Sequence, residues 1–325
     1  MKRKIILRSL LIFITFIFYV TYLSSYGSAQ QSNGFVPPDG KILLFIGQDQ
    51  KTIQEYIYSA GVIPGGFMVY TSLKNLEGLT EAAEYGSGIQ HAQYFVDGYP
   101  HMAVQLGLHM VGILDGVTSG HYDINIVRLA QWIQQTQRPV YLRIGYEFDL
   151  PQNRYNPKKY VQAFRYIVDY FRRLEVSNVA FVWHSCAGYA PSRMDWYPGD
   201  EYVDWFAVSF FDPYNRGNMD FVATRARERG KPFMIAEATP KGIGVSGGQR
   251  AWDKWYERFF QFIDRQNVRA ICYINSNWEE LPMFKGKKWL NARVQDNDVI
   301  NRHWLDRMNS GQYLHASEEL FFLLK

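Results

Sequence analysis

The sequence predicts a single-domain (β/α)8 TIM barrel, and three observations favour this fold. Eight short apolar runs have the length of buried strands, and amphipathic segments separate them. No internal repeat or low-complexity insertion divides the chain. From residue 30 onward, its length is near the ~250 residues typical of this barrel. The main alternative is a doubly wound open sheet, but Gly47-Gln48-Asp49 is not the Gly-rich phosphate loop of such folds.

The expected strands share a continuous apolar composition, which is typical of strands covered on both faces. They are Ile42–Ile46, Phe67–Tyr70, Met102–Met110, Val140–Ile144, Val179–Trp183, Trp205–Phe210, Phe233–Ala236 and Ala270–Ile274. In a barrel of this kind, the carboxyl ends of all strands face the active site. The residues at those ends are Asp49, His109, Glu147, Trp183 or His184, Phe211, Glu237 and Trp278.

Between the strands, apolar residues recur at the spacing of helices that cover a sheet. One stripe follows Asn156-Pro157, which predicts a capped helix start with Pro at the first helical position. We expect three such stripes to be core: Tyr160, Phe164, Ile167, Phe171 and Leu174; Ile126, Leu129, Ala130 and Ile133; and Trp252, Trp255, Tyr256, Phe259 and Ile263.

The N-terminus has the pattern of a secretory signal peptide. Basic residues precede an apolar run from Leu10 to Leu23, and Gly27-Ser28-Ala29 supplies small residues for cleavage before Gln30. The alternative is an uncleaved membrane anchor. We therefore expect a signal peptide at residues 1–29, a linker at 30–40 and the barrel domain at 41–325, in a protein that is secreted or periplasmic.

The charge balance excludes several classes of partner. Four basic residues of the leader, Lys2, Arg3, Lys4 and Arg8, account for the whole formal net charge of +4. A neutral mature chain without a basic stripe is a poor candidate for binding nucleic acid or anionic membranes. The histidines show no HExxH or paired spacing, so we expect no metal and no cofactor. We also expect a monomer, with Cys186 and Cys272 free.

The stretch Pro139–Asp149 carries charges on a strand that is otherwise apolar. Alternation places Val140, Leu142 and Ile144 on one face and Tyr141, Arg143, Gly145 and Glu147 on the other. Buried charges are rare unless they are paired. One interpretation is a structural Arg143–Glu147 pair. The other is a catalytic carboxylate at a strand end, where α/β barrels place reactive groups.

A second apolar run, in Lys231–Pro240, also ends in a carboxylate, Glu237. Two carboxyl groups that share a cleft are what glycoside hydrolysis requires, because one must donate a proton while the other stays ionised. Arg143 can either hold the neighbouring carboxylate ionised or neutralise Glu147. The sequence leaves both possibilities open.

Several segments in this order resemble glycoside hydrolase family 26, a β-mannanase-type family in a clan of retaining (β/α)8 glycosidases. They are R-x-x-x-E at Arg143–Glu147, then Trp183, WYPGDEYVDWFAVSFF at Trp196–Phe211 and KPFMIAE at Lys231–Glu237. The resemblance is clear from about Pro139 to Glu237. It implies that Glu147 is the acid/base and Glu237 the nucleophile.

The same resemblance suggests a substrate site lined by Arg143, His109, Trp183, Phe211, Tyr214 and Trp278. Trp278 matches the tryptophan that forms the floor of the sugar site in this clan. His109 matches a substrate-contacting histidine only loosely, and a core histidine bonded to backbone is the alternative. For Trp183, the sequence favours substrate contact and core packing equally.

Three departures from the family pattern concern the surroundings of the two carboxylates. Tyr146 stands where the family has His before the acid/base, and Ser209 stands where it has Asp. Phe211 replaces the Tyr whose hydroxyl bonds the nucleophile, and Tyr214 is a possible substitute donor.

We therefore expect a secreted glycosidase that hydrolyses a β-linked polysaccharide by double displacement, with β-mannan as the first candidate. A retaining mechanism predicts a separation of about 5–5.5 Å between the two carboxyls. The alternatives are a non-catalytic glycan-binding barrel and a retaining glycosidase of the same clan that acts on a bacterial exopolysaccharide.

Overall fold

A computed structural model describes residues 34–188 and 193–324 of the chain. The expected signal peptide, residues 1–29, and the first residues of the expected linker lie outside these ranges. Within them, every helix is too short or too polar to cross a lipid bilayer.

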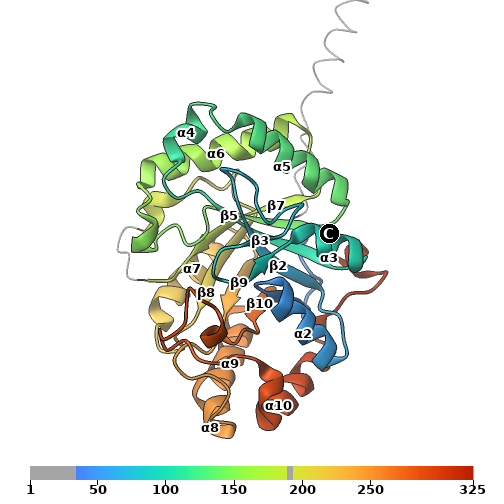
Figure 1. The fold of residues 1–325 in the computed structure, drawn as a ribbon. Helices are drawn as coiled ribbons and strands as arrows, with labels where there is room; N and C mark the ends of the chain where they lie inside the picture. Colours follow the sequence, from blue (N-terminus) through green and yellow to red (C-terminus); the bar gives the residue numbers. More distant parts are fainter. Residues whose placement is uncertain (1–33, 189–192, 325) are drawn as a thin grey trace, which may run out of the picture. The chain divides into compact units, whose positions relative to one another are not determined.

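Eight parallel strands close into a barrel, as the sequence predicts. Each strand pairs with the next barrel strand along the chain, and the eighth pairs with the first. Figure 1 shows the strands at the centre, with helices such as α5, α6, α9 and α10 outside them. The barrel strands are β1 (Ile42–Gly47), β2 (Gly66–Ser72), β5 (Ala103–His109), β6 (Val140–Ile144), β7 (Val179–Ser185), β8 (Trp205–Phe210), β9 (Phe233–Ala238) and β10 (Ala270–Ile274).

Helices connect successive strands, and the predicted apolar stripes face the barrel. In α6, Asn156 accepts a hydrogen bond from the Lys159 N–H and Pro157 opens the helix, as the sequence predicts. The helices are α2 (Gln50–Ala60), α3 (Ala92–Gly98), α4 (Leu114–Thr118), α5 (Asp123–Thr136), α6 (Pro157–Arg173), α7 (Arg216–Glu228), α8 (Gln249–Ala251), α9 (Glu257–Gln266), α10 (Asp298–Met308) and α11 (Leu320–Leu323).

Short elements complete the chain. The described part of the β7–β8 connection has only a 3₁₀ turn, η2 (Arg193–Trp196), and no α-helix. A π-helical turn, η3 (Trp252–Tyr256), links α8 to α9. The minor strands are the hairpin pair β3 (Ala83–Glu84) and β4 (Ile89–Gln90), and β11 (Tyr313–Leu314), which pairs with the start of β1. The remaining 3₁₀ turns are η1 (Pro151–Asn153), η4 (Trp278–Glu280) and η5 (Val294–Asp296).

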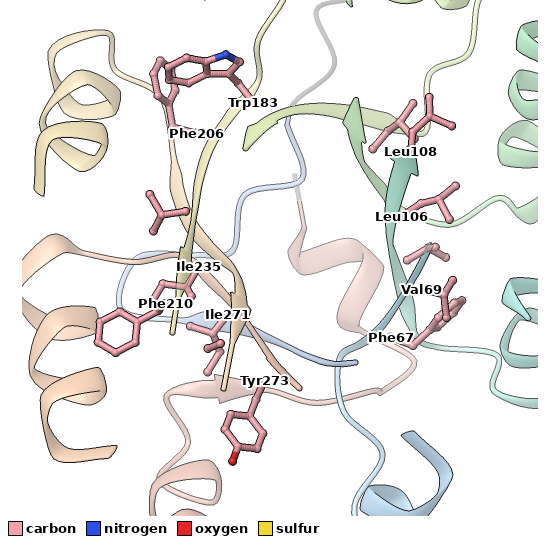
Figure 2. Packing of buried hydrophobic residues seen from close by; sticks show 14 of the residues in the cluster. Phe67, Val69, Leu106, Leu108, Trp183, Phe206, Phe210, Ile235, Ile271 and Tyr273 are labelled. Atoms are coloured by element: carbon pink, nitrogen blue, oxygen red, sulfur yellow. The ribbon is translucent and has the colours of Figure 1, made fainter. Parts of the chain in front are cut away.

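Alternating residues of each strand divide the core into two layers. Val140, Leu142 and Ile144 of β6 belong to the layer between barrel and helices, whereas Tyr141 belongs to the barrel interior. Figure 2 shows members of the outer layer, among them Phe210, projecting from the strands toward the helices. The predicted split of β6 into two faces is therefore confirmed, and Arg143 lies on the interior face.

The amino ends of the strands are closed by segments from both ends of the described chain. The Tyr141 hydroxyl donates to the Phe35 carbonyl at 2.5 Å, and the Trp205 indole N–H donates to the Gly34 carbonyl at 2.5 Å. Leu320 and Leu324 belong to the same interior cluster, against which Phe35 also packs. Residues 34 and 35, inside the expected linker, are thus part of the packed barrel. Cys186 and Cys272 are free, as expected.

Candidate active site

Glu147 lies in a tight turn just after β6. The turn places Gly145 at φ 56° and Glu147 at φ 50°, a left-handed conformation that a residue with a side chain adopts at a cost. Two side chains hold the turn: Asn153 donates to the Glu147 carbonyl at 2.9 Å, and the Tyr160 hydroxyl donates to the Ile144 carbonyl at 2.9 Å. The strained backbone is therefore fixed from both sides, with the Glu147 side chain 9% exposed.

Glu237 lies near the end of β9, beside a β-bulge. Val208 of β8 pairs with Ile235, but Ser209 pairs with Glu237, so Ala236 is the extra residue. Simple alternation would put Glu237 on the outer face with Ile235. The bulge instead turns Glu237 toward the barrel interior, where it meets Arg143.

Arg143 is fully buried and pairs with Glu237, not with Glu147. Its Nη1 donates to Glu237 Oε1 at 2.5 Å. The guanidinium carbon lies 5.2 Å from the ring centroid of Tyr70 and 5.3 Å from that of Tyr146, which provides cation–π contacts. The structural Arg143–Glu147 pair is thus absent from the structure. Arg143 has no exposed surface in this structure, and it reaches the site through Glu237.

The two carboxylates have different electrostatic surroundings. Burial, followed by the negative charge of Glu237, raises the pKa of Glu147 to about 8. A hydrogen bond from Ser209 Oγ to Glu147 Oε1, at 2.7 Å, opposes this rise. Glu237 instead holds an ion pair with a guanidinium that cannot lose its proton. The site therefore combines a carboxyl that stays protonated at neutral pH with a charged carboxylate beside it.

The hydroxyl that bonds Glu237 comes from Tyr70 on β2. Burial, followed by the negative charge of Glu237, raises the pKa of Tyr70, which therefore remains a donor to the carboxylate. Tyr214, the expected substitute for the family tyrosine, is 63% exposed and lies against the guanidinium of Arg258. It does not take that role in the structure.

The two expected tryptophans lie in packed positions. Trp183 is fully buried in the outer layer, stacked on Phe148 at 4.4 Å between ring centroids, and points away from the barrel interior (Figure 2). Of its two open roles, the structure places it in the packing role. Trp278 is 1% exposed, because Trp289 and Phe284 cover it at 4.6 and 4.5 Å. The expected open sugar floor at Trp278 is therefore covered in this structure.

The remaining predicted positions lie at the rim of the barrel mouth. His109 ends β5 with an exposed side chain, and its ring lies 6.4 Å from that of Tyr146. Phe211 follows β8 and contacts the edge of Trp289 at 5.3 Å. Trp289 is partly exposed, and the Lys241 ammonium lies 4.3 Å from its ring centroid. The partly exposed aromatic rings around Trp278 are therefore Trp289, Phe211 and Phe284.

Tyr70 completes the site without having been predicted, whereas His184 and Ser209 were noted from the sequence only as a strand-end residue and as a departure from the family pattern. Tyr70, His184 and Ser209 all lie on interior faces of their strands, a position that strand alternation could have indicated. Behind Glu147, the Asp149 carboxylate accepts from Ser185 Oγ at 2.6 Å and from Arg193 Nε at 2.7 Å. Within residues 34–188 and 193–324, no cluster of three His, Cys, Asp or Glu side chains is placed to hold a metal ion.

The arrangement is suited to proton donation and nucleophilic attack on one substrate. A protonated Glu147 can give its proton to a leaving group, and an ionised Glu237 can attack or stabilise an electrophilic carbon. Both carboxylates are held by side chains of the barrel interior, Glu237 by Arg143 and Glu147 by Ser209.

Comparison with known proteins agrees with this chemistry. Residues 125–243 match the model of glycosyl hydrolase family 26. The chain is 31% identical to a β-1,3-xylanase of a Vibrio species, over 90% of this chain and 70% of that protein. It is 29% identical to a β-1,3-xylanase of an Alcaligenes species, over 90% of this chain and 69% of that protein.

Solved structures share the fold at lower sequence identity. A family 26 β-mannanase of Bacteroides ovatus superposes with a TM-score of 0.65 at 14% identity, over 88% of this chain and 93% of that one. An endo-β-1,4-mannanase of Cellulomonas fimi superposes with a TM-score of 0.63 at 16% identity, over 89% of this chain and 76% of that one. These matches support the barrel architecture.

Proposed function

This chain belongs to glycosyl hydrolase family 26, and from that premise we propose that it is a secreted enzyme that hydrolyses β-1,3-xylan by double displacement. The observation that carries the proposal is the contrast between two neighbouring carboxylates. Glu147 has a raised pKa, and Glu237 is ion-paired with Arg143. Retaining glycosidases need this combination of a protonated acid and a charged nucleophile.

In the proposed reaction, Glu147 protonates the glycosidic oxygen as the bond to the anomeric carbon breaks. A Glu237 oxygen attacks that carbon from the opposite face and forms a glycosyl ester. Glu147, now ionised, accepts a proton from the incoming water, which releases the sugar with its original anomeric configuration. Tyr70 supports the first step by holding Glu237 in place, a role that Phe211 has no hydroxyl to perform.

The choice of β-1,3-xylan rests on the curated relatives. Two β-1,3-xylanases match along 90% of the chain, whereas the mannanase structures share 14–16% identity and support the fold alone. β-Mannan, the first candidate from the sequence, becomes the comparison substrate. Trp289 is the proposed stacking surface for a sugar ring, because it is the larger of the two partly exposed rings that cover Trp278.

The proposed location outside the cytoplasm follows from the leader. Residues 1–29 combine a basic start, an apolar run and small residues before the cleavage point. Sequencing the N-terminus of the protein recovered from the culture medium or periplasm tests this, and Gln30 is the expected first residue. Retention of the leader in a membrane fraction would contradict it.

The experiment for the activity compares substrates and product configuration. We expect the chain from Gln30 to release reducing ends from β-1,3-xylan faster than from β-mannan, β-1,4-xylan, β-glucan or a bacterial exopolysaccharide. Proton NMR of the first products should show the β-anomer before mutarotation. Initial α-anomer would contradict double displacement. Binding to β-1,3-xylan with no cleavage of any substrate would favour a non-catalytic barrel.

The pH dependence tests the assignment of the acid. Because Glu147 must be protonated to act, kcat/KM should fall as the pH rises through its pKa of about 8. Glu147→Gln should lose this limb and retain activity only on aryl glycosides whose leaving group needs no proton. The matched variant Glu237→Gln should be inactive on both kinds of substrate. The reverse pattern would exchange the two roles.

A further inference from the structure

A continuous hydrogen-bonded chain inside the barrel connects the two carboxylates. Arg143 Nη1 contacts both Glu237 Oε1, at 2.5 Å, and His184 Nδ1, at 3.3 Å. His184 Nε2 lies 3.1 Å from Ser209 Oγ, and Ser209 Oγ lies 2.7 Å from Glu147 Oε1. The three linking side chains come from β6, β7 and β8, and each is at most 3% exposed.

The polarity of this chain follows from its first member. A guanidinium has donors and no acceptor, so His184 Nδ1 must accept from Arg143 and cannot carry a proton. A neutral imidazole then carries its proton on Nε2, which donates to Ser209 Oγ. The hydroxyl proton of Ser209 is therefore free to point only toward Glu147 Oε1. Burial, followed by the charge of Arg143, lowers the pKa of His184 and keeps the ring neutral.

We propose that His184 and Ser209 are positioning residues that fix which oxygen of Glu147 carries the acidic proton. Since Oε1 accepts from Ser209, the proton that Glu147 donates resides on Oε2. This inference rests on the proposed role of Glu147 as the acid. It gives a reason for Ser at position 209: a hydroxyl can donate to a neighbouring carboxyl, whereas an ionised Asp cannot.

The other groups around Glu147 do not replace this donor. In addition to burial, the charges of Glu237, Arg143 and Asp149 affect the pKa of Glu147. The charge of Glu147 in turn adds to burial in raising the pKa values of Tyr146 and Cys186. The Asp149 carboxylate is occupied by Ser185, Arg193 and the Cys186 N–H. In the part of the chain that the structure describes, Ser209 is the side chain that donates to the Glu147 carboxyl.

The first test uses the unmodified protein and needs no substrate. Nitrogen-15 NMR of histidine-labelled protein should show one imidazole that stays neutral from pH 5 to 9 with its proton on Nε2. Loss of that signal in His184→Gln assigns it to His184. A ring that titrates in this range, or one protonated on Nδ1, would overturn the proposal.

The second test measures the ionisation of Glu147 directly. Carbon-13 NMR of glutamate-labelled protein, assigned with Glu147→Gln, follows its carboxyl through the pH range. Ser209→Ala removes a donor to the ionised form, so the midpoint should rise by about one pH unit. Ser209→Thr, which keeps the hydroxyl, should restore it. The control is Ser276→Ala, which removes another buried hydroxyl, one that bonds Asp49 and Thr52 at the mouth.

The outcomes separate this inference from the proposed function. Thermal unfolding first confirms that the variants fold. An unchanged Glu147 midpoint in folded Ser209→Ala, or an equal shift in Ser276→Ala, would refute the positioning role even if the enzyme cleaves β-1,3-xylan. If the wild type cleaves no polysaccharide, the proposed function fails, while the two NMR titrations still decide the hydrogen-bonded chain. With an active enzyme, the alkaline limb of kcat/KM should move upward with the NMR midpoint.

Discussion

Glu147 and Glu237 are chemically identical side chains whose partners make them different. Glu147 has a hydroxyl donor and a negative neighbour, whereas Glu237 has a buried guanidinium and a tyrosine hydroxyl. Burial and the charge of its neighbour raise the pKa of Glu147, whereas Glu237 is held in an ion pair by Arg143. At the scale of single residues, the site is therefore built by what surrounds the carboxylates.

Tyr70→Phe tests whether the nucleophile depends on a hydroxyl from β2. A hydrogen bond to a charged group contributes about 1.5–3 kcal/mol, so we expect kcat to fall by roughly 10–100-fold and the free energy of unfolding to fall by no more than that amount. Steady-state kinetics on the best substrate measures this effect.

Tyr214→Phe is the matched control for that change. Its ring is mostly exposed and lies beside Arg258, so its kinetics should equal those of the wild type. Loss of activity in Tyr214→Phe, with Tyr70→Phe unaffected, would show that Tyr214, as expected from the sequence, supplies the hydroxyl that bonds Glu237.

The carboxylates could be predicted from sequence, and their partners only in part. Arg143 beside an ionised carboxylate was one of two open interpretations, whereas the Tyr70 contact was not predicted. Glu147 and Glu237 each follow an apolar run of strand length, which marks a barrel's reactive edge. Tyr70 precedes Glu237 by more than half the barrel and meets it only because the strands close into a ring. No local pattern encodes that contact. The apolar residues around Trp183 in the sequence fitted a place in the site or in the core equally well. The face of β7 on which Trp183 lies distinguishes the two, and it is the outer face.

At the scale of elements, one turn and one bulge aim the two carboxylates. Gly145 and Glu147 give the turn after β6 its left-handed backbone, and the extra residue in β9 turns Glu237 inward. Such irregularities are common beside active sites because they re-aim single side chains. The bulge leaves no mark in the run Phe233–Ala236, so alternation alone would have placed Glu237 outside.

Gly145→Ala tests the turn. A Cβ at Gly145 would lie 2.8 Å from Met110 Cε and 2.8 Å from Tyr160 Cε2, in a backbone at positive φ. We expect a loss of about 1–3 kcal/mol in the free energy of unfolding and a marked fall in kcat. Urea denaturation and kinetics measure the two effects.

Gly98→Ala provides the comparison for Gly145→Ala. Gly98 ends α3 without a positive φ, and a Cβ there would meet nothing within 4 Å. It should be neutral or slightly stabilising. Equal effects of the two changes would show that the geometry of the Glu147 turn is not the cause.

The segment after β10 contains two tryptophans in different surroundings, the buried Trp278 and the partly exposed Trp289. Trp278 donates its indole N–H to Thr239 Oγ1 at 3.0 Å and lies under Trp289 and Phe284. Trp278→Ala should therefore cost about 3–5 kcal/mol of stability. Trp289→Ala should instead raise KM for the polysaccharide, with a smaller change in melting temperature. A folded Trp278→Ala with a normal melting temperature and a raised KM would favour the sugar-floor role that the family resemblance implies.

At the scale of the whole molecule, the barrel is sealed at the end opposite the carboxylates. The carbonyls of Gly34 and Phe35 bond Trp205 and Tyr141, and Phe35 packs on the interior cluster. These contacts precede the expected domain start at residue 41, so we predict that the folding unit includes residues 34 and 35. The apolar pattern of the strands predicted the barrel, but a few residues around Pro37-Pro38 gave no periodic signal of their packing.

Truncation to residue 41 tests this extension of the domain. Compared with a chain that starts at Gln30, it loses the hydrogen bonds of Tyr141 and Trp205 to residues 35 and 34 and the packing of Phe35. It also loses the bonds of Arg269 to Pro37 and Asp39. We expect a loss of about 2–4 kcal/mol, seen as a lower melting temperature. A chain that starts at Asn33 is the control and should match the longer one. Equal stability of all three would assign residues 34–40 to a true linker.

The buried Arg143–Glu237 pair has a consequence for engineering. Under the proposed mechanism, replacing the nucleophile Glu237 by Ala or Gly would prevent formation of the glycosyl ester and leave an enzyme suited to joining sugars from activated donors. Here that change would leave a guanidinium with no exposed surface and no counter-charge, and breaking a buried pair costs about 3–5 kcal/mol. Formate or fluoride in the vacated volume would restore the balance. We therefore expect a synthase made by this replacement to need such anions in order to stay folded, even when no substrate is present.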